Sequence, residues 1–210
     1  MPYGGVLTEK EVQGVAGEQM SVYDKKGDYH YDIASAFIKS MRGSDPQAAL
    51  HYLARMIAGG EKTSFISRRI IICAAEDVGL ADPDALRVAV SAAQAAEMVG
   101  FPEAQIILAE AVLYISLAPK SNSTVVGISA AMTDIAKKSN WSIPRHLKDA
   151  HYNGANRLGY GIAYKYPHAY PEHFVKQNYM NEKIKFYEFG NNKFERAAAE
   201  YFKKIKKSEK

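Results

Sequence analysis

Residues that start and stop helices alternate at short intervals along this chain, and this punctuation restricts the fold more than any other feature. Ser44-Asp45-Pro46 places a capping side chain before a proline suited to the first helical turn, and Gly59-Gly60 ends the segment. Asp82-Pro83 repeats the start signal and Gly100 the stop. Apolar residues between these signals recur three and four positions apart, and no convincing run alternates with period two. The pattern predicts an all-α chain.

Further helices are expected on the same grounds. Phe101-Pro102-Glu103 opens a helix directly after Gly100. The apolar spacing also predicts helices over residues 32–41, 63–78, 123–138 and 193–206. The first three of these should add to one helical body, whereas the last is basic and ends the chain.

Two central helices have predicted core faces. The helix after Asp82 should turn one face inward, which carries Leu86, Ala89, Val90 and Ala93. The next helix has one stripe with apolar flanks, so we expect burial nearly all round; the stripe is Leu108, Ala111, Val112 and Ile115. Small residues wrap around more of the first helix than one core face requires, which favours contact with another copy of the chain; they are Ala85, Ala89, Ala92, Ala93, Ala95 and Ala96.

The two ends of the chain differ from this body. Thr8-Glu9-Lys10-Glu11 is a capping box that predicts a short helix over residues 9–20, typical of the end of a preceding domain. After Trp141, seven of the 14 tyrosines fall among glycines and prolines. This composition predicts an irregular Tyr/Pro/Gly-rich segment before the basic C-terminal helix.

The charge is unevenly distributed. The formal net charge is +4, but residues 1–140 carry net −3 and residues 141–210 carry net +7. A nucleic acid is therefore a plausible partner for the C-terminal third only, with candidate contacts at Lys203, Lys204, Lys206 and Lys207. A solvated helix end, where lysines complement the helix dipole, is the simpler explanation.

No residue pattern indicates a catalytic, cofactor or metal site. Gly59-Gly60-Glu61-Lys62-Thr63 ends like a phosphate-binding loop, but Glu61 stands where that loop needs glycine, so we expect a turn between helices. The six histidines lack zinc-ligand spacing. Cys73, the single cysteine, lies on an apolar face and is expected in the core. No segment resembles a signal peptide or a membrane span, so a cytoplasmic protein is expected.

Charged residues within the helices are interpreted as structural. Glu110 interrupts an otherwise apolar helix, so we expect it to be buried against Arg68, Arg69 or Arg87. Glu76 and Asp77 share a helix with two of these arginines at spacings of seven to nine, which favours contacts to another helix or subunit.

Long motifs closely resemble the replication-associated recombination protein A family, the MgsA/RarA type of AAA+ ATPase, whose eukaryotic relative is the Werner helicase-interacting protein. They are YDKKGDYHYD at residues 23–32, SAFIKSMRGSDP at 35–46, AALHYLARM at 48–56, AAEDVGLADP at 74–83, LAPKS at 117–121, YKYPH at 164–168 and YP at 170–171. Together they cover most of residues 8–190, and runs of this length are specific.

The resemblance implies a domain order. Such proteins carry an ATPase module, a helical lid and then a helical oligomerisation domain similar in role to the clamp-loader collar. The phosphate loop, Walker B pair and nucleotide-sensing arginine of the family are not matched, so this chain resembles the C-terminal fragment. Residues 1–20 would end the lid, residues 21–140 would form the oligomerisation domain, and residues 141–210 would hold the Tyr-rich segment and basic helix.

The resemblance also implies a function. The family is a DNA-dependent ATPase at stalled replication forks that uses ATP and Mg, assembles as tetramers and associates with single-stranded-DNA-binding protein at the nucleoid. We expect this fragment to be its assembly module, with no catalytic residue of its own. The alternative is a stand-alone nucleic-acid-binding module that uses the basic third. Candidate structural or interface residues from the motifs and helices are Arg42, Asp45, Arg68, Arg69, Glu76, Asp77, Glu110 and Lys120.

Overall fold

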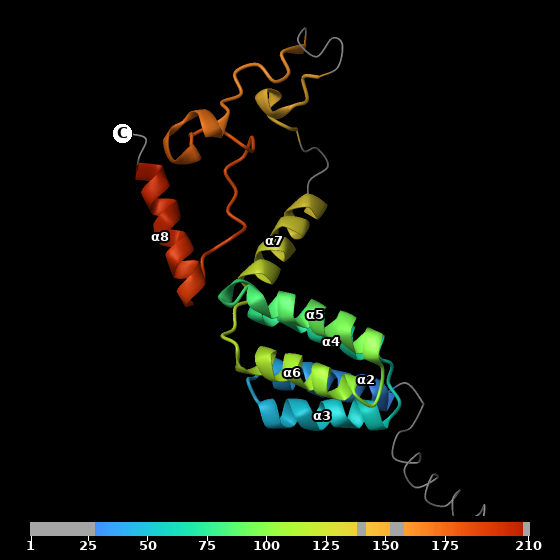
Figure 1. Cartoon of the computed structure of the whole chain (residues 1–210). Coiled ribbons are helices and arrows are strands. Elements are labelled where there is room, and N and C mark those ends of the chain that lie inside the picture. The colour runs from blue at the N-terminus through green and yellow to red at the C-terminus, as the bar shows by residue number, and fades with distance from the viewer. Residues whose placement is uncertain (1–27, 138–141, 152–157, 208–210) are drawn as a thin grey trace, which may run out of the picture. The chain divides into compact units, whose positions relative to one another are not determined.

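A computed structural model describes residues 28–137, 142–151 and 158–207, and this part of the chain is all-α, as predicted (Figure 1). Its α-helices are α2 (Asp28–Arg42), α3 (Pro46–Ala58), α4 (Thr63–Cys73), α5 (Asp84–Val99), α6 (Ala104–Leu117), α7 (Ser123–Lys137) and α8 (Lys193–Lys207). The predicted helix over residues 9–20 lies outside the described ranges. Within those ranges, no helix is long and apolar enough to cross a bilayer.

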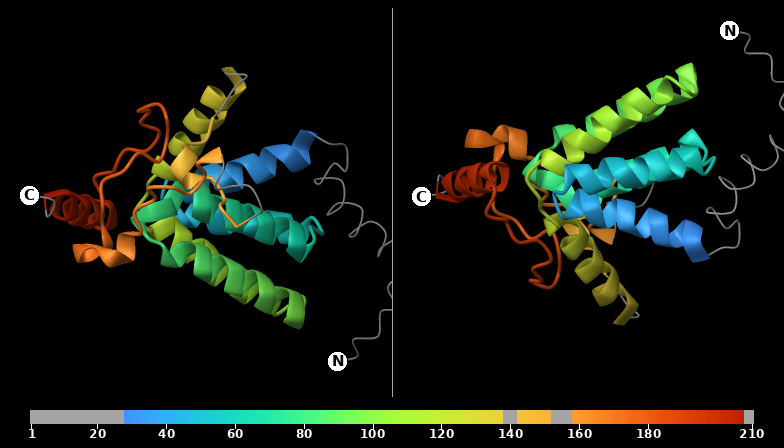
Figure 2. Two further views of the ribbon diagram at one scale, coloured as in Figure 1. Left: turned by 90° about the horizontal axis from the view of Figure 1, so that it is seen from above. Right: turned by 90° about the horizontal axis from the view of Figure 1, so that it is seen from below.

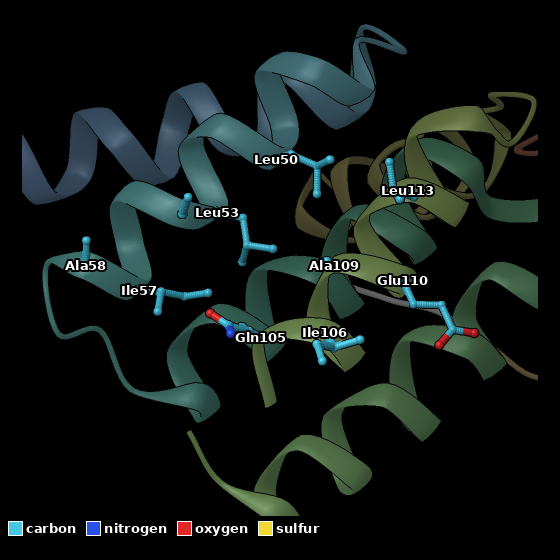
Figure 3. A pocket seen from close by; sticks show the side chains of 10 residues that line it. Leu50, Leu53, Ile57, Ala58, Gln105, Ile106, Ala109, Glu110 and Leu113 are labelled. Carbon is cyan, nitrogen blue, oxygen red and sulfur yellow. The ribbon is translucent and has the colours of Figure 1, made fainter. Parts of the chain in front are cut away.

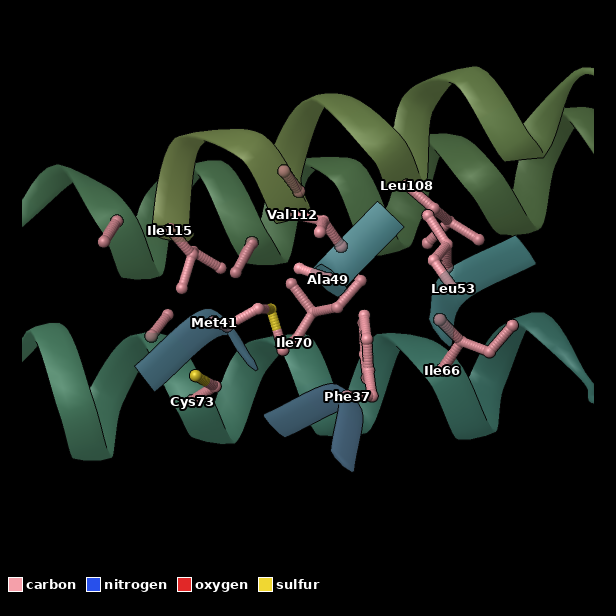
Figure 4. Packing of buried hydrophobic residues seen from close by; sticks show 14 of the residues in the cluster. Phe37, Met41, Ala49, Leu53, Ile66, Ile70, Cys73, Leu108, Val112 and Ile115 are labelled. Carbon is pink, nitrogen blue, oxygen red and sulfur yellow. The ribbon is translucent and has the colours of Figure 1, made fainter. Parts of the chain in front are cut away.

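The chain divides into two compact units, Met1–Lys120 and Ser121–Lys210, which are described separately. In unit 1, α6 packs against α2, α3, α4 and α5, and α2 also contacts α3 and α4 (Figure 2). The large core side chains point toward one another between these helices, as Figure 4 shows; they include Phe37, Met41, Ile66, Ile70, Leu108, Val112 and Ile115. Cys73 lies in this core, as predicted.

Local capping sets the helix boundaries. The Asp45 carboxylate accepts the backbone N–H groups of Gln47 and Ala48 at 3.0 and 2.9 Å, so α3 begins where the sequence predicted. Gly59 and Gly60 form a turn between α3 and α4, as expected. The predicted helix over residues 63–78 is α4 followed by a π-helical turn, Ala74–Val78. This wider turn directly follows α4 and carries Glu76 and Asp77.

The predicted inner face of α5 is half right. Ala89 is buried and Ala93 is half-buried, as predicted, but Leu86 and Val90 are exposed, and Ala85 and Ala96 are buried in their place. Alanine at the contact lets α5 approach α6 and α4 closely, so its smallest side chains face the bundle. Leu86 and Val90, which directly follow Ala85 and Ala89 in the sequence, therefore face outward.

The prediction for α6 is half right. Its stripe of Leu108, Ala111, Val112 and Ile115 is fully buried, but the helix is not covered all round. Ile106 is 69% exposed and Leu117 is 71% exposed, because the other four helices cover only part of the α6 circumference. An apolar face of α6 is therefore left open.

Unit 2 consists of α7, an irregular segment with short 3-10 turns, and α8. The large apolar side chains of α7 are largely exposed, including Ile128 and Met132, and Gly127 is the one buried residue of this helix. A Cβ on Gly127 would lie 3.4 Å from the carbonyl oxygen of Phe186, so the glycine permits the irregular segment to approach the helix backbone. The basic helix α8 confirms the predicted boundaries to within one residue.

The aromatic side chains of α8 are not the ones that it buries. Phe194, Tyr201 and Phe202 are exposed, whereas Ile205 and the carboxylate of Glu195 are buried. The Glu195 carboxylate accepts hydrogen bonds from the Ser121 hydroxyl at 2.6 Å, from the Tyr187 hydroxyl at 2.8 Å and from the Asn192 amide. A buried carboxylate thus joins the start, the irregular segment and the last helix of unit 2.

Candidate functional site

Charged residues from three parts of unit 1 meet where α2 ends. Arg42, the last residue of α2, donates its Nε–H to Asp77 Oδ1 at 2.5 Å, and its Nη2 lies 3.6 Å from Glu76 Oε1. Asp77 is buried, whereas the guanidinium and Glu76 are partly exposed. The π-helical turn brings both carboxylates to the end of α2, as the sequence spacing alone did not reveal. The hydrogen bond to Asp77 raises the pKa of Arg42.

Cys73 completes the buried side of this cluster. Its thiol donates to Asp77 Oδ2 at 3.3 Å, four residues along the chain. Burial raises the pKa of Cys73, and the hydrogen bond to Asp77 raises it further. Both effects favour the protonated thiol, which is the less reactive form.

Lys120 fastens the end of α6 to the turn after α2. Its ammonium donates to the carbonyl oxygens of Ile115, Ser116 and Ala118 at 2.9, 3.1 and 2.7 Å. It also donates to Ser44 Oγ at 3.1 Å. A cation at this position satisfies carbonyls that the helix end leaves without partners and complements the helix dipole. Burial lowers the pKa of Lys120.

These contacts form a brace that holds helix ends together. Five of the eight sequence candidates lie in or beside it: Arg42, Asp45, Glu76, Asp77 and Lys120. Arg42, Asp77 and Lys120 each make their hydrogen bonds to other groups of unit 1. In the parts of the chain that the structure describes, no three His, Cys, Asp or Glu side chains are arranged to hold a metal ion.

Removing Arg42 tests the brace. In the Arg42→Ala variant, the buried Asp77 carboxylate loses its cation, and we expect unit 1 to lose about 2 kcal/mol of stability, less than for a fully buried pair because the guanidinium is half exposed. Urea unfolding measures the loss. Arg87→Ala is the matched control because its pair with Asp84 is exposed, so it should lose less than about 0.5 kcal/mol. Equal losses in the two variants would contradict the brace.

The remaining candidates lie elsewhere. Arg68 and Arg69 stand over the Phe65 ring, with guanidinium carbons 5.9 and 5.0 Å from its centroid. His30 packs on the same ring at 4.6 Å and pairs with Glu61. The sequence analysis missed Phe65, although its spacing of three and four residues from the arginines is the signal for such a contact.

The prediction for Glu110 is wrong. Its side chain is exposed, so it needs no buried partner, and Arg87 pairs with Asp84 instead. The reason is that Glu110 belongs to the face of α6 that the bundle leaves uncovered.

That open face of α6 and the neighbouring face of α3 enclose an apolar groove of about 770 Å³. Figure 3 shows side chains from both helices directed toward it; the lining residues are Leu50, Leu53, Ala54, Ile57, Ala58, Gln105, Ile106, Ala109, Glu110 and Leu113. Only one of them is charged. The sequence analysis did not predict this groove, because it expected α6 to be buried nearly all round.

The lysines of α8 are exposed. Lys204 pairs with Glu172 at 3.1 Å, and Lys206 Nζ lies 4.2 Å from the centroid of the Phe202 ring. Lys206 therefore stands beside aromatic surface, while Lys203 and Lys207 share the last turns of the helix.

Known proteins match nearly the whole chain. The family model for the MgsA AAA+ ATPase C-terminal region matches residues 43–206, and the model for an AAA C-terminal domain matches residues 3–42. Replication-associated recombination protein A of Bacillus subtilis is 49% identical over 189 residues, which are 88% of this chain and 45% of that protein.

Two further relatives give the same picture. An uncharacterized AAA domain-containing protein of Mycobacterium tuberculosis is 51% identical over 162 residues, 77% of this chain and 36% of that protein. Replication-associated recombination protein A of Escherichia coli K12 is 39% identical over 163 residues, 78% of this chain and 36% of that protein. The chain thus spans less than half the length of these relatives.

Proposed function

The chain belongs to the MgsA AAA+ ATPase C-terminal family, and on this basis we propose that it is the assembly module of a clamp-loader-like, DNA-dependent ATPase. Its work is to hold ATPase modules together so that each nucleotide site meets its neighbour. The observation that carries the proposal is the apolar groove between α3 and α6. The brace at the end of α2 supports it, because an assembly face needs rigid helices.

A second copy of the chain is the proposed occupant of the groove. Two neighbouring helices form its walls. The ridge of side chains on a third helix can pack into a groove of this kind. Ile106, 69% exposed, lies in the groove, and a large apolar side chain in that position is stabilised when water is excluded. Every copy also supplies apolar helix faces suited to such a site, including Leu86 and Val90 on α5.

The wider role is proposed from the relatives. Two of them are named for replication-associated recombination, so we propose that the whole protein acts at stalled replication forks, in the cytoplasm and at the nucleoid. ATP and Mg would bind in an ATPase module, and DNA and single-stranded-DNA-binding protein would be partners. The proposed division places the end of the lid in residues 1–20, the oligomerisation domain in 21–140 and the Tyr-rich and basic part in 141–210.

Light scattering of the chain tests the assembly role. A tetramer would have about four times the 23.2 kDa mass of one chain. We expect Ile106→Glu to reduce the assembly to the single-chain mass, because a carboxylate would be buried in an apolar interface. Leu117→Glu is the matched control: Leu117 is equally exposed on the same helix, at 71%, but does not line the groove.

Two outcomes would contradict this proposal. A single-chain mass for the wild type at every concentration would refute assembly by this module. Equal dissociation of the Ile106→Glu and Leu117→Glu variants would refute the groove as the interface. Circular dichroism should show the same helical content in all three proteins.

A further inference from the structure

Unit 2 exposes an unusual number of aromatic rings beside lysines. Tyr164, Tyr166 and Tyr179 are 44%, 60% and 54% exposed. Lys165 stands between the first two, and Lys176 precedes the third by three residues. Exposed rings next to cations are a common feature of surfaces that bind single-stranded nucleic acids.

One side chain holds these rings together. The Gln177 amide donates to the carbonyl oxygen of Lys165 at 2.8 Å, and its oxygen accepts the backbone N–H of the same residue at 3.2 Å. The amide also donates to the Tyr179 hydroxyl at 3.0 Å. This amide clamp therefore links Tyr179 to the stretch of backbone from which Tyr164 and Tyr166 project.

A pocket of about 520 Å³ lies beside the clamp. Phe174 and the buried Val175 contribute its apolar lining, with the rings of Tyr179 and Phe202. Its two charged lining residues are Lys176 and Lys206, and none of its lining residues is a carboxylate. The pocket is thus lined by both the irregular segment and α8. These two parts of unit 2 also contact each other through the ion pair of Lys204 and Glu172 (Figure 1).

We propose that this pocket binds single-stranded nucleic acid, with a base against Tyr179 and neighbouring phosphates at Lys176 and Lys206. An aromatic ring stacks on any base, so the site would bind with little sequence preference. The net charge of +7 over residues 141–210 supports a polyanion. The repeated exposed tyrosines fit a polymer of repeated bases better than an acidic peptide. This binding does not depend on assembly through the α3–α6 groove.

Fluorescence anisotropy with a labelled oligothymidine of about 20 nucleotides tests the site. Tyr179→Ala should weaken binding about tenfold, whereas Tyr179→Phe, which keeps the ring, should bind as the wild type does. Lys206→Glu should also weaken binding and should reduce the slope of log affinity against log salt by about 0.7 or more. Measurements at low protein concentration, and in the Ile106→Glu background, separate this binding from assembly.

Lys193→Glu is the matched control for charge, since it changes the net charge equally at the other end of α8. If it weakens binding as much as Lys206→Glu, only net charge matters and the site is refuted. Unchanged affinity in Tyr179→Ala would also refute it. Competition by polyglutamate as strong as by unlabelled oligothymidine at equal charge would show a site for acidic chains in general, and would overturn the proposal.

Discussion

Replacing Phe37 by alanine is expected to cost unit 1 about 4 kcal/mol of its free energy of unfolding. Phe37 has no exposed surface and stands among Met41, Ile70 and Leu108 in the centre of the helical bundle (Figure 4). Removing its ring takes away a large apolar contact of α2 and leaves a cavity that the neighbouring helices α3, α4 and α6 cannot close. A loss of this size is a large part of the stability of a domain.

Urea unfolding followed by circular dichroism measures the loss, and segment-resolved hydrogen exchange assigns it to unit 1. Tyr31→Ala is the matched control, because Tyr31 is an aromatic residue of the same helix but is 63% exposed. It should change the stability by less than about 0.5 kcal/mol. A loss below about 1 kcal/mol in Phe37→Ala would contradict the packing of α2 in the core.

The second large effect is expected at Glu195, in unit 2. Burial alone would raise the pKa of this carboxyl, but hydrogen bonds from Ser121, Ser123, Tyr187 and the backbone N–H of Gly190 outweigh it and lower the pKa to about 2. The ordinary value is 4.5, so the ionised form stabilises the folded unit by about 3 kcal/mol. Glu195→Ala should therefore lose about this amount at neutral pH.

The sign of the pH dependence follows from the lowered pKa. The stabilisation by Glu195 is complete above pH 4.5 and is lost as the pH falls from there toward 2. Hydrogen exchange of unit 2 at pH 7 and pH 3 should show this loss in the wild type and much less of it in Glu195→Ala. Glu188→Ala is the control, since Glu188 is exposed and pairs only with Lys185 on the surface. The same pH response in the wild type and Glu195→Ala would contradict the assignment.

Helix boundaries could be predicted from sequence because the signals that set them are local. The cap at Asp45 needs only the two residues that follow the proline after it. The orientation of a helix depends on its partners instead. In α5, either the alanines or the larger residues Leu86 and Val90 could have faced the core. The alanines do, because small side chains permit close packing.

The polar sites show the same limit. Motif residues such as Arg42 and Lys120 could be selected, but their partners lie 35 and 76 residues away in the sequence, at Asp77 and Ser44. Glu195 was not selected from sequence. It is buried only because Ser121, Tyr187 and Asn192, which lie outside α8, donate hydrogen bonds to it. Neither arrangement has a periodic pattern that a sequence could display.

The helix α2 belongs to two modules at once. The match to the AAA C-terminal domain ends at Arg42, the last residue of α2, yet Phe37 and Met41 of the same helix lie in the core of the bundle. Fifteen residues of α-helix make a stiff rod of about 22 Å. His30 near the start of this rod packs on Phe65, and Phe37 and Met41 further along lie in the core, so the bundle holds the rod over most of its length. A force that displaces α2 is therefore transmitted to the whole bundle.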